Sequence, residues 1–323
     1  MRAARLELAL HSGALVLPQT GRIAVLRPQA GDDLSVLPKD RVTLVQGFRP
    51  DHDRFAAAGW DVTVTPPADP AAVLVCLPRA KAEAHALLAE AAAAPLSIVD
   101  GQKLDGIDSI LRDLRRRGTV SEPVIKAHGK LFTFRADLSD WRAAPRQVDG
   151  YETRPGVFSA DGPDPASVLL ADALPALSGR VIDLGAGWGF LARRALERGA
   201  RSVDLVEAEA DALECARVNV PDPRARFHWA DALTWRPEAL ARHVICNPPF
   251  HRGRETDPQL GMAFVAAAAR MLAPDGTLWL VANRHLPYAD TLARHFRTST
   301  EIGGNGSFRV IRAEHPLKRQ EAA

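Results

Sequence analysis

A regular alternation of short apolar runs with segments of helical spacing extends over residues 180–314 and constrains the fold more than any other feature. The predicted strands are 180–184, 202–208, 226–231, 243–247 and 277–283, and the predicted helices are 190–199, 210–219, 258–272 and 285–296. Strands spaced by helices of this length indicate an α/β fold with a parallel, doubly wound sheet. A closing hairpin at 303–306 adds 308–314 as an antiparallel strand.

The first half of the chain has the same rhythm. Its strand-like runs are 42–46, 61–65, 72–78 and 96–100, and its helix-like segments are 51–59, 81–94 and 106–118. Residues 138–155 are polar, contain proline and glycine, and have no clear periodicity, which is typical of a linker. A chain of 323 residues exceeds the usual size of one domain. We therefore predict two domains, 1–140 and 151–323.

Three segments of the first half align without gaps on three segments of the second. These pairs are 96–114 on 278–296, 129–137 on 306–314, and 73–79 on 244–250. Because their order and approximate spacing also match, we infer a duplicated fold, with chance alignment of two α/β halves as the alternative. The first copy has no glycine loop and places Leu77 at the position of Asn247. We expect it to be degenerate and to bind RNA or stabilise the other domain.

Bulk composition excludes several classes of protein. The net charge of +2 gives no overall basic field, so any contact with RNA has to come from local basic groups. Cys76, Cys215 and Cys246 lie far apart, which indicates neither a disulfide framework nor a zinc site. The apolar N-terminal run resembles a weak secretion signal but is interrupted by Glu7 and His11. No run is long enough to span a membrane, and we expect a cytoplasmic protein without a metal.

The segment VIDLGAGWGF (181–190) joins a strand to a helix through three glycines. Gly185, Gly187 and Gly189 allow a tight turn and a close approach of the backbone to a ligand. About 20 residues further on, Glu207 ends the second strand, where a carboxylate can accept hydrogen bonds from ribose hydroxyls. Asp183 precedes the loop and suits a cationic ligand better than a pyrophosphate. We therefore predict S-adenosylmethionine as the cofactor rather than NAD.

An aspartate ends the third predicted strand and an asparagine ends the fourth, and both are candidate site residues. Asp231 is predicted to contact the adenine amine, or alternatively to cap a helix that begins after it. In VICNPPFHRG (244–253), Asn247 and Pro248 offer a side-chain oxygen and a backbone carbonyl that can accept both N–H groups of an exocyclic amine. Phe250 can stack on a flat substrate. The alternative is that this corner is only a rigid turn.

The motifs IDLGAGWG, VEAEADAL, CNPPFHRG and VANRHLPY resemble class I methyltransferases that modify exocyclic amines. Residues 154–174 are similar to a segment of the ribosomal RNA guanine-N2 methyltransferases of type C, which act on the small subunit, with type G of the large subunit as a close relative. The resemblance covers about 151–315 and is mostly architectural over 1–140. It implies a degenerate methyltransferase-like domain followed by an active one.

The resemblance also implies roles for individual residues. Gly185, Gly187 and Glu207 should hold the cofactor, with Asp183 near its amino group, and Asn247, Pro248 and Phe250 should hold the target guanine. Phe158 and Asp164 lie in the segment expected to fold over the cofactor, although DPAS replaces the usual D-x-G-S there. His251 matches the family pattern and is expected to be a structural donor.

Arg252 and Arg254 flank the presumed base pocket and are the best candidates for RNA contacts. The predicted function is methylation of guanine N2 in ribosomal RNA, most consistent with the 16S RNA of the small subunit, by a monomer. The alternatives are large-subunit RNA, adenine N6, a protein glutamine, a non-catalytic RNA-binding assembly factor and, remotely, an NAD oxidoreductase.

Overall fold

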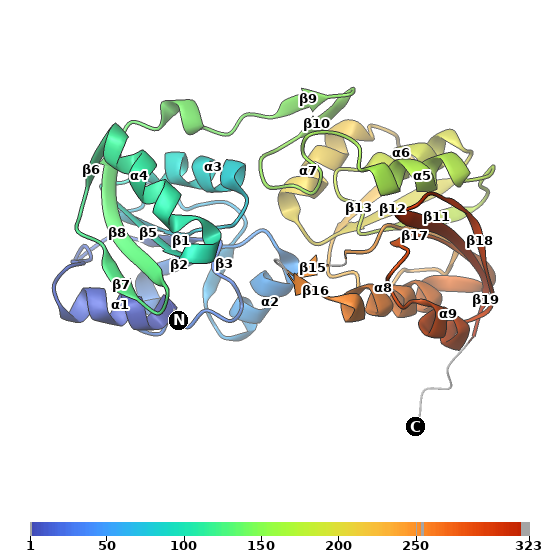
Figure 1. Cartoon of the computed structure of the whole chain (residues 1–323), viewed down its shortest axis with the longest axis horizontal. Helices are drawn as coiled ribbons and strands as arrows, with labels where there is room; N and C mark the ends of the chain where they lie inside the picture. The colour runs from blue at the N-terminus through green and yellow to red at the C-terminus, as the bar shows by residue number, and fades with distance from the viewer. Residues whose placement is uncertain (1, 250, 253–254, 318–323) are drawn as a thin grey trace. The chain divides into compact units, whose positions relative to one another are not determined.

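The computed structural model describes residues 2–249, 251–252 and 255–317 (Figure 1). The chain divides into two compact units, Met1–Pro145 (unit 1) and Arg146–Ala323 (unit 2). In the described part of the chain, no helix is both long and apolar enough to cross a membrane. Each unit is built around its own sheet and is described separately below.

Unit 1 contains one mixed sheet with helices on both faces. Its strands are β1 (Ile23–Leu26), β2 (Val42–Val45), β3 (Asp61–Thr63), β4 (Ala72–Cys76), β5 (Leu96–Gln102), β6 (Gly118–Val120), β7 (Val124–Lys126) and β8 (Gly129–Ala136). Its helices are α1 (Arg2–His11), α2 (Arg49–Ala57), α3 (Lys81–Ala91) and α4 (Ile107–Arg117), with short 3-10 turns η1 (Lys39–Arg41), η2 (Lys103–Asp105) and η3 (Ser139–Trp141).

Unit 2 repeats this plan and adds two short hairpins. Its main strands are β11 (Arg180–Leu184), β12 (Ser202–Glu207), β13 (Ala225–Trp229), β14 (Ala241–Cys246), β17 (Leu272–Asn283), β18 (Phe296–Gly304) and β19 (Phe308–Pro316). The hairpins are β9 (Arg146–Val148) with β10 (Tyr151–Thr153) and β15 (His251–Arg252) with β16 (Glu255–Thr256). The helices are α5 (Pro165–Ala173), α6 (Phe190–Glu197), α7 (Ala210–Asn219), α8 (Pro258–Met271) and α9 (Ala289–His295).

The two sheets have the same strand order, which confirms the predicted duplication. The order is β3-β2-β1-β4-β5-β8-β6 in unit 1 and β13-β12-β11-β14-β17-β19-β18 in unit 2. In both units the first five strands of this order pair in parallel, and the long return strand, β8 or β19, pairs antiparallel to its neighbours. In unit 1, β7 is an additional strand that pairs with β8.

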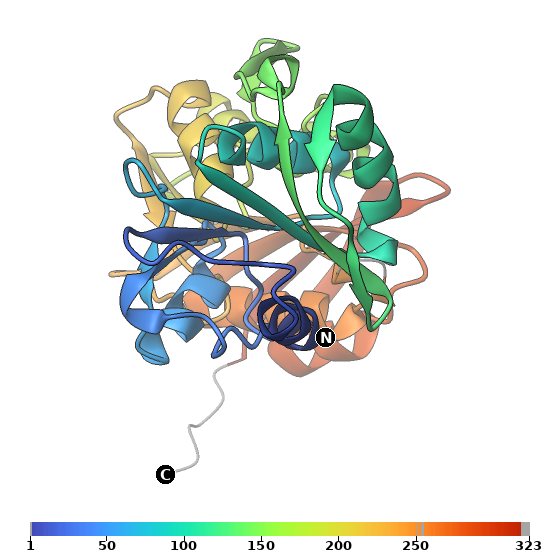
Figure 2. The same ribbon diagram turned by 90° about the vertical axis from the view of Figure 1, so that its left-hand side faces the viewer.

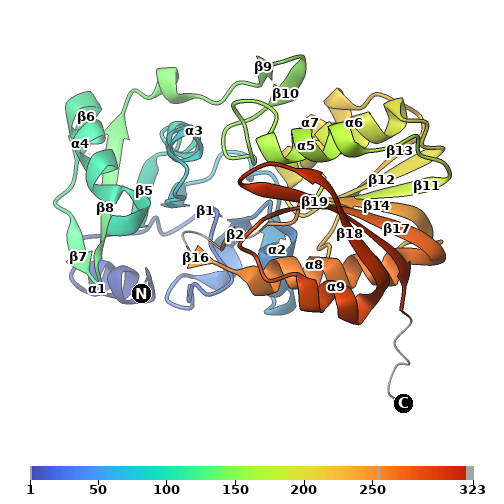
Figure 3. The same ribbon diagram turned by 45° about the vertical axis from the view of Figure 1, so that its right-hand side comes forward.

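Both faces of the central strands of each sheet are buried, which explains why these strands are nearly continuous apolar runs. In unit 1, α3 and α4 pack on one face and α1 and α2 on the other (Figure 2). In unit 2, α5, α6 and α7 cover the face that includes Val203 and Ile245, and α8 and α9 cover the face that includes Val244 and Leu278 (Figure 3).

These faces correct the predicted counterpart of Asn247 and agree with the pairing of 73–79 on 244–250, in which Cys76 stands opposite Asn247. Leu77 packs in the cluster beneath α3 and α4, whereas the side chain of Asn247 contacts α5 on the face opposite α8. Cys76 packs with Leu6 of α1, the helix that precedes β1 in unit 1 as α5 precedes β11 in unit 2. Since a slip of one residue moves a side chain to the other face of a sheet, Cys76 and not Leu77 corresponds to Asn247.

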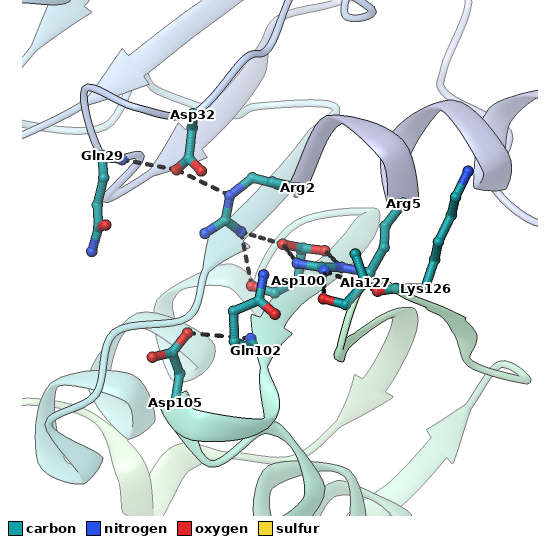
Figure 4. Close-up of polar contacts among 9 residues, drawn as sticks. All are labelled: Arg2, Arg5, Gln29, Asp32, Asp100, Gln102, Asp105, Lys126 and Ala127. Atoms are coloured by element: carbon teal, nitrogen blue, oxygen red, sulfur yellow. Dashed lines mark hydrogen bonds and ion pairs between the residues drawn. The ribbon is translucent and has the colours of Figure 1, made fainter.

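Ion pairs anchor α1 to the sheet of unit 1 (Figure 4). The fully buried guanidinium of Arg5 donates from Nε and Nη2 to the two carboxylate oxygens of Asp100 on β5, at 2.6 and 2.9 Å. Arg2 also donates to the Asp100 side chain, and its Nε lies 3.0 Å from Asp32. A Cβ on Gly129 would lie 2.5 Å from Nη1 of Arg5, so only glycine fits beside this guanidinium.

Several elements differ from their predicted bounds. The N-terminal run, compared above with a secretion signal, forms α1 and buries Leu6 and Ala9 against the sheet. The elements that were not predicted include β1, α5 and the short strands β6, β7, β9, β10, β15 and β16, and β9 with β10 falls in the segment predicted as a linker. The third strand of unit 2 ends at Trp229 rather than at residue 231, and the final strand pair extends further than the predicted hairpin.

Candidate active site

The candidate site lies at the carboxyl ends of β12, β11 and β14, which are adjacent in the sheet. Chain order reverses between β11 and β14, because β12 follows β11 on one side and β14 returns on the other. Open α/β sheets bind their ligands at such a switch point. The predicted residues Asp183, Glu207 and Asn247 come from these three strands or from the residue that follows them.

The three glycines of the loop after β11 have left-handed backbones but different surroundings. Their φ angles are +79° at Gly185, +54° at Gly187 and +90° at Gly189. A Cβ on Gly189 would lie 2.8 Å from the side chain of Val220, so this glycine lets α6 pack closely. A Cβ on Gly187 would meet nothing within 4 Å. The loop is therefore open at Gly187, where a ligand can approach the backbone.

Glu207 ends β12 and holds the glycine loop. Its Oε2 accepts from the backbone N–H of Gly187 at 2.7 Å, and its Oε1 accepts from that of Glu209 at 2.8 Å. Burial raises the pKa of this carboxyl group, and the backbone N–H groups oppose the shift. Because a carboxylate has about four acceptor positions, both oxygens retain capacity for further donors.

Asp183 is fully buried on β11, and neither carboxylate oxygen has a hydrogen-bond partner among the described residues. Burial raises its pKa to about 8, and the neighbouring charge of Glu207 adds to the shift. The N–H of Ala192 lies close enough to favour the charged form but not in hydrogen-bonding geometry. A buried carboxylate without a partner is costly, which is typical of a group that awaits a cationic ligand.

The raised pKa of Asp183 predicts that the free energy of unfolding of unit 2 falls as the pH rises. Because the folded protein keeps a proton that the unfolded chain loses near pH 4, this group destabilises unit 2 progressively between about pH 4 and pH 8. Asp183→Asn should flatten this dependence, with a gain on the order of a few kcal/mol at pH 8. Hydrogen exchange in β11, followed at pH 5 and pH 8 in the wild-type chain and in Asp183→Asn, measures the change in the free energy of unfolding. Equal pH slopes in both proteins would contradict the prediction, and Asp275→Asn, at an exposed surface ion pair, is the control.

Asn247 follows β14, and two residues of α5 fix the orientation of its amide. Its Nδ2 donates to Oδ2 of Asp164 and to Oγ of Ser167, both at 2.9 Å. The opposite amide orientation would place the Asn247 oxygen against the Asp164 carboxylate, so the contact assigns the two atoms. Both amide hydrogens are used within the protein, which leaves Oδ1 as the acceptor for a ligand.

Asp164 therefore supports Asn247, although its segment was expected to cover the cofactor. It is the N-cap of α5, and its Oδ2 also accepts from the backbone N–H of Ser167 at 2.9 Å. Ser167, which is 7% exposed, was not among the predicted site residues. The signal that could have found it is the D-P-x-S pattern, since aspartate followed by proline is typical of a helix start.

The segment before α5 is tied to the glycine loop through Trp188. The buried indole of Trp188 donates from Nε1 to the backbone oxygen of Phe158 at 2.9 Å. The Phe158 side chain is 61% exposed. The structure thus places Phe158 next to the glycine loop as an exposed aromatic surface.

Asp231 lies just beyond β13 and stabilises a local turn. Its Oδ1 accepts from the backbone N–H of Leu233 at 2.9 Å, and residues 232–234 form a turn rather than the helix that the alternative prediction required. A cofactor contact of Asp231 remains a prediction.

The predicted base pocket is described only in part. Pro248 is buried directly after Asn247. Arg252 and His251 belong to β15, which pairs with β16. Phe250 and Arg254 lie outside the described residues, so their predicted roles stay predictions.

Comparison with known proteins identifies the family. The model of the methyltransferase small domain matches residues 150–312. A ribosomal RNA small subunit methyltransferase C from Shewanella loihica is 32% identical over 48% of this chain and 46% of its own length, so the chain spans about half of that relative. The corresponding protein of Hahella chejuensis is 29% identical over 94% of both chains.

Two further relatives add to this. A ribosomal RNA large subunit methyltransferase G of a Shewanella species is 28% identical over 77% of this chain and 71% of its own. The solved structure of a T. thermophilus 16S rRNA N2 methyltransferase, RsmC, in complex with AdoMet and guanosine is 26% identical, with a TM-score of 0.77 over 93% of this chain and 90% of that one. The predicted two-domain fold is confirmed, and the chain belongs to the methyltransferase small domain family.

Proposed function

We propose that this chain transfers a methyl group from S-adenosylmethionine to the exocyclic N2 amine of a guanine in ribosomal RNA of the small subunit. The observation that carries the proposal is the fixed amide of Asn247. Its two hydrogens are held by Asp164 and Ser167, and its oxygen stays available at the carboxyl edge of the sheet. An amide that is fixed in this way can only accept a hydrogen bond from its substrate.

The residues around the glycine loop fit S-adenosylmethionine. The unpartnered carboxyl group of Asp183 suits the ammonium group, whose positive charge would favour its ionised form, Gly187 leaves the backbone open, and Glu207 has spare acceptor positions for ribose hydroxyls. When bound, this cofactor would supply an electrophilic methyl group on a sulfonium.

The protein's own contribution to the reaction is positioning. The lone pair of an exocyclic amine is delocalised into the base, so the nitrogen is a poor nucleophile. If Asn247 Oδ1 and the Pro248 carbonyl accept its two N–H groups, the nitrogen is held at one angle and its pyramidal form is favoured. The new N–C bond forms as the S–C bond breaks, and the amine then loses one proton to solvent.

The relatives support guanine and the small subunit. The solved relative contains guanosine, and the small-subunit relative from Hahella chejuensis matches over more of its length than the large-subunit one does. We place the reaction in the cytoplasm, where such RNA is found. The large-subunit match over 71% of that relative makes large-subunit RNA the second candidate.

A comparison of ribosomal RNA from cells with and without the protein tests this function. We expect one N2-methylguanosine of small-subunit RNA to disappear in the deletion strain and to return with the wild-type chain but not with Asn247→Ala. Mass spectrometry of RNA fragments identifies the position. Loss of a methylguanosine from large-subunit RNA would select the second candidate, and an unchanged methylation map would refute both.

A further inference from the structure

A depression of about 400 Å³ on unit 1 lies between α3, α4 and η3. It is lined by Lys81, His85, Asp113, Arg116, Arg117 and Trp141. Three of these side chains are permanent cations and one is an acid. Figure 2 shows α3 and α4 side by side on this face of unit 1.

An aromatic pair holds one of the cations in place. The rings of His85 and Trp141 stack at 3.8 Å with an angle of 3° between their planes. The guanidinium of Arg117 lies 4.7 Å from the Trp141 ring, and its Nη1 bonds Asp140 at 2.7 Å. Burial, with the nearby charges of Lys81 and Arg117, lowers the pKa of His85. Trp141 therefore orients an arginine instead of offering a free face to a base.

The outer face of α4 extends the positive surface. Its inner face buries Ile107, Ile110, Leu111 and Leu114, and Arg112, Arg115 and Arg116 are exposed on the other side. Arg112 and Arg116 are four residues apart, roughly 6 Å along the helix axis. This cationic surface is longer than one phosphate group, which favours a polyanion over a free anion.

The arginine run is not required by the fold. The equivalent helix of unit 2, α9, has the sequence ADTLARH and lacks three consecutive arginines. Asp113, Asp140 and Glu122 neutralise part of the charge, through pairs with Arg116, Arg117 and Arg115. Even so, Arg116 keeps 76% of its side chain exposed, and Lys81 is also exposed.

We propose that Lys81, Arg116 and Arg117, with the adjacent outer face of α4, bind the phosphate backbone of the RNA substrate. This inference rests on the proposed function for the identity of the RNA. Two N–H groups of one arginine guanidinium can donate to two oxygens of one phosphate. Contacts to the phosphate backbone fix the position of an RNA without reading its sequence. The surface thus gives the unit without a glycine loop a direct part in holding substrate.

The test is Arg116→Glu in the full chain, with Arg54→Glu as its matched control. Both arginines are exposed, lie in the last turn of a helix of unit 1, and stand three residues after an aspartate, Asp113 or Asp51. The probe is purified small-subunit ribosomal RNA. At low salt, Arg116→Glu should weaken binding about tenfold and reduce the slope of log affinity against log salt by about 1, and Arg54→Glu should change neither. Lys81→Glu combined with Arg116→Glu should weaken binding further.

The outcomes separate this inference from the proposed function. A raised KM for RNA with unchanged kcat and melting temperature in Arg116→Glu supports it. If the wild-type chain binds RNA but transfers no methyl group, and Arg116→Glu still weakens the binding, the proposed function is refuted. The proposed RNA-binding surface is then still supported. The inference fails if Arg116→Glu and the double variant retain wild-type affinity and salt slope, or if the wild-type chain does not bind the RNA.

Discussion

Asn247→Ala is expected to lower methyl transfer to RNA by about a thousandfold while the affinity for S-adenosylmethionine stays within about twofold. Removing one preorganised hydrogen-bonding group from an active site typically costs 10²–10³ in kcat, and here the orientation of the nucleophile is lost as well. Single-turnover transfer from labelled cofactor and calorimetric cofactor binding measure the two quantities. Loss of both together would show that the corner after β14 is structural.

Ser167→Ala tests the same contact as Asn247→Ala and is expected to have a smaller effect. It removes one of the two acceptors that fix the Asn247 amide and leaves Asp164 in place. We expect transfer to fall roughly tenfold, less than in Asn247→Ala, because one hydrogen bond still orients the amide. A rate equal to that of the wild-type chain would mean that Ser167 contributes nothing to the orientation.

Asp100→Asn is expected to destabilise unit 1 by about 3–5 kcal/mol, since it leaves the buried guanidinium of Arg5 without its countercharge. Arg5 and Asp100 are both fully buried, so water cannot take the place of the lost carboxylate. Hydrogen exchange in β5 and β8 should report the loss.

Asp32→Asn provides the comparison for this prediction. Asp32 forms an ion pair with Arg2, accepts from the backbone N–H of Gln29 and retains 17% exposure, so its loss should cost less than that of Asp100. If Asp32→Asn and Asp100→Asn destabilise unit 1 equally, the ion pairs of Arg2 contribute more to the free energy of unfolding than the buried pair of Arg5 with Asp100.

Local patterns were sufficient to predict the sheet and the placement of the main site residues. Asp183, Glu207 and Asn247 stand at strand ends, and strand ends follow from apolar runs and glycines that are close in sequence. Their convergence then follows from parallel pairing, because the carboxyl ends of parallel strands share an edge. The prediction of S-adenosylmethionine depended on one further local feature, the acid before the glycines.

What the sequence could not predict depends on distant partners or on the choice of face. Arg2 and Arg5 look like surface residues, and their burial depends on Asp100, 95 positions or more away, with Asp32 as a second partner of Arg2. The contact of Asn247 with Ser167 spans 80 positions. The error at Leu77 has another cause. The pairing of 73–79 with 244–250 without gaps already sets Cys76, not Leu77, opposite Asn247, so the assignment to Leu77 was displaced by one residue, and a displacement of one residue changes the face of the strand.

The double role of Asp164 links local folding to catalytic competence. One oxygen of this carboxylate accepts from the first turn of α5 and from the Asn247 amide. When the first turn of α5 opens, the same event frees the amide to rotate, so an incompletely folded unit cannot present a correctly oriented acceptor. The fraction of molecules with a correctly oriented acceptor therefore depends on the stability of this helix start. A substitution that only strengthens the start of α5 should raise the fraction of competent molecules without touching any reacting group.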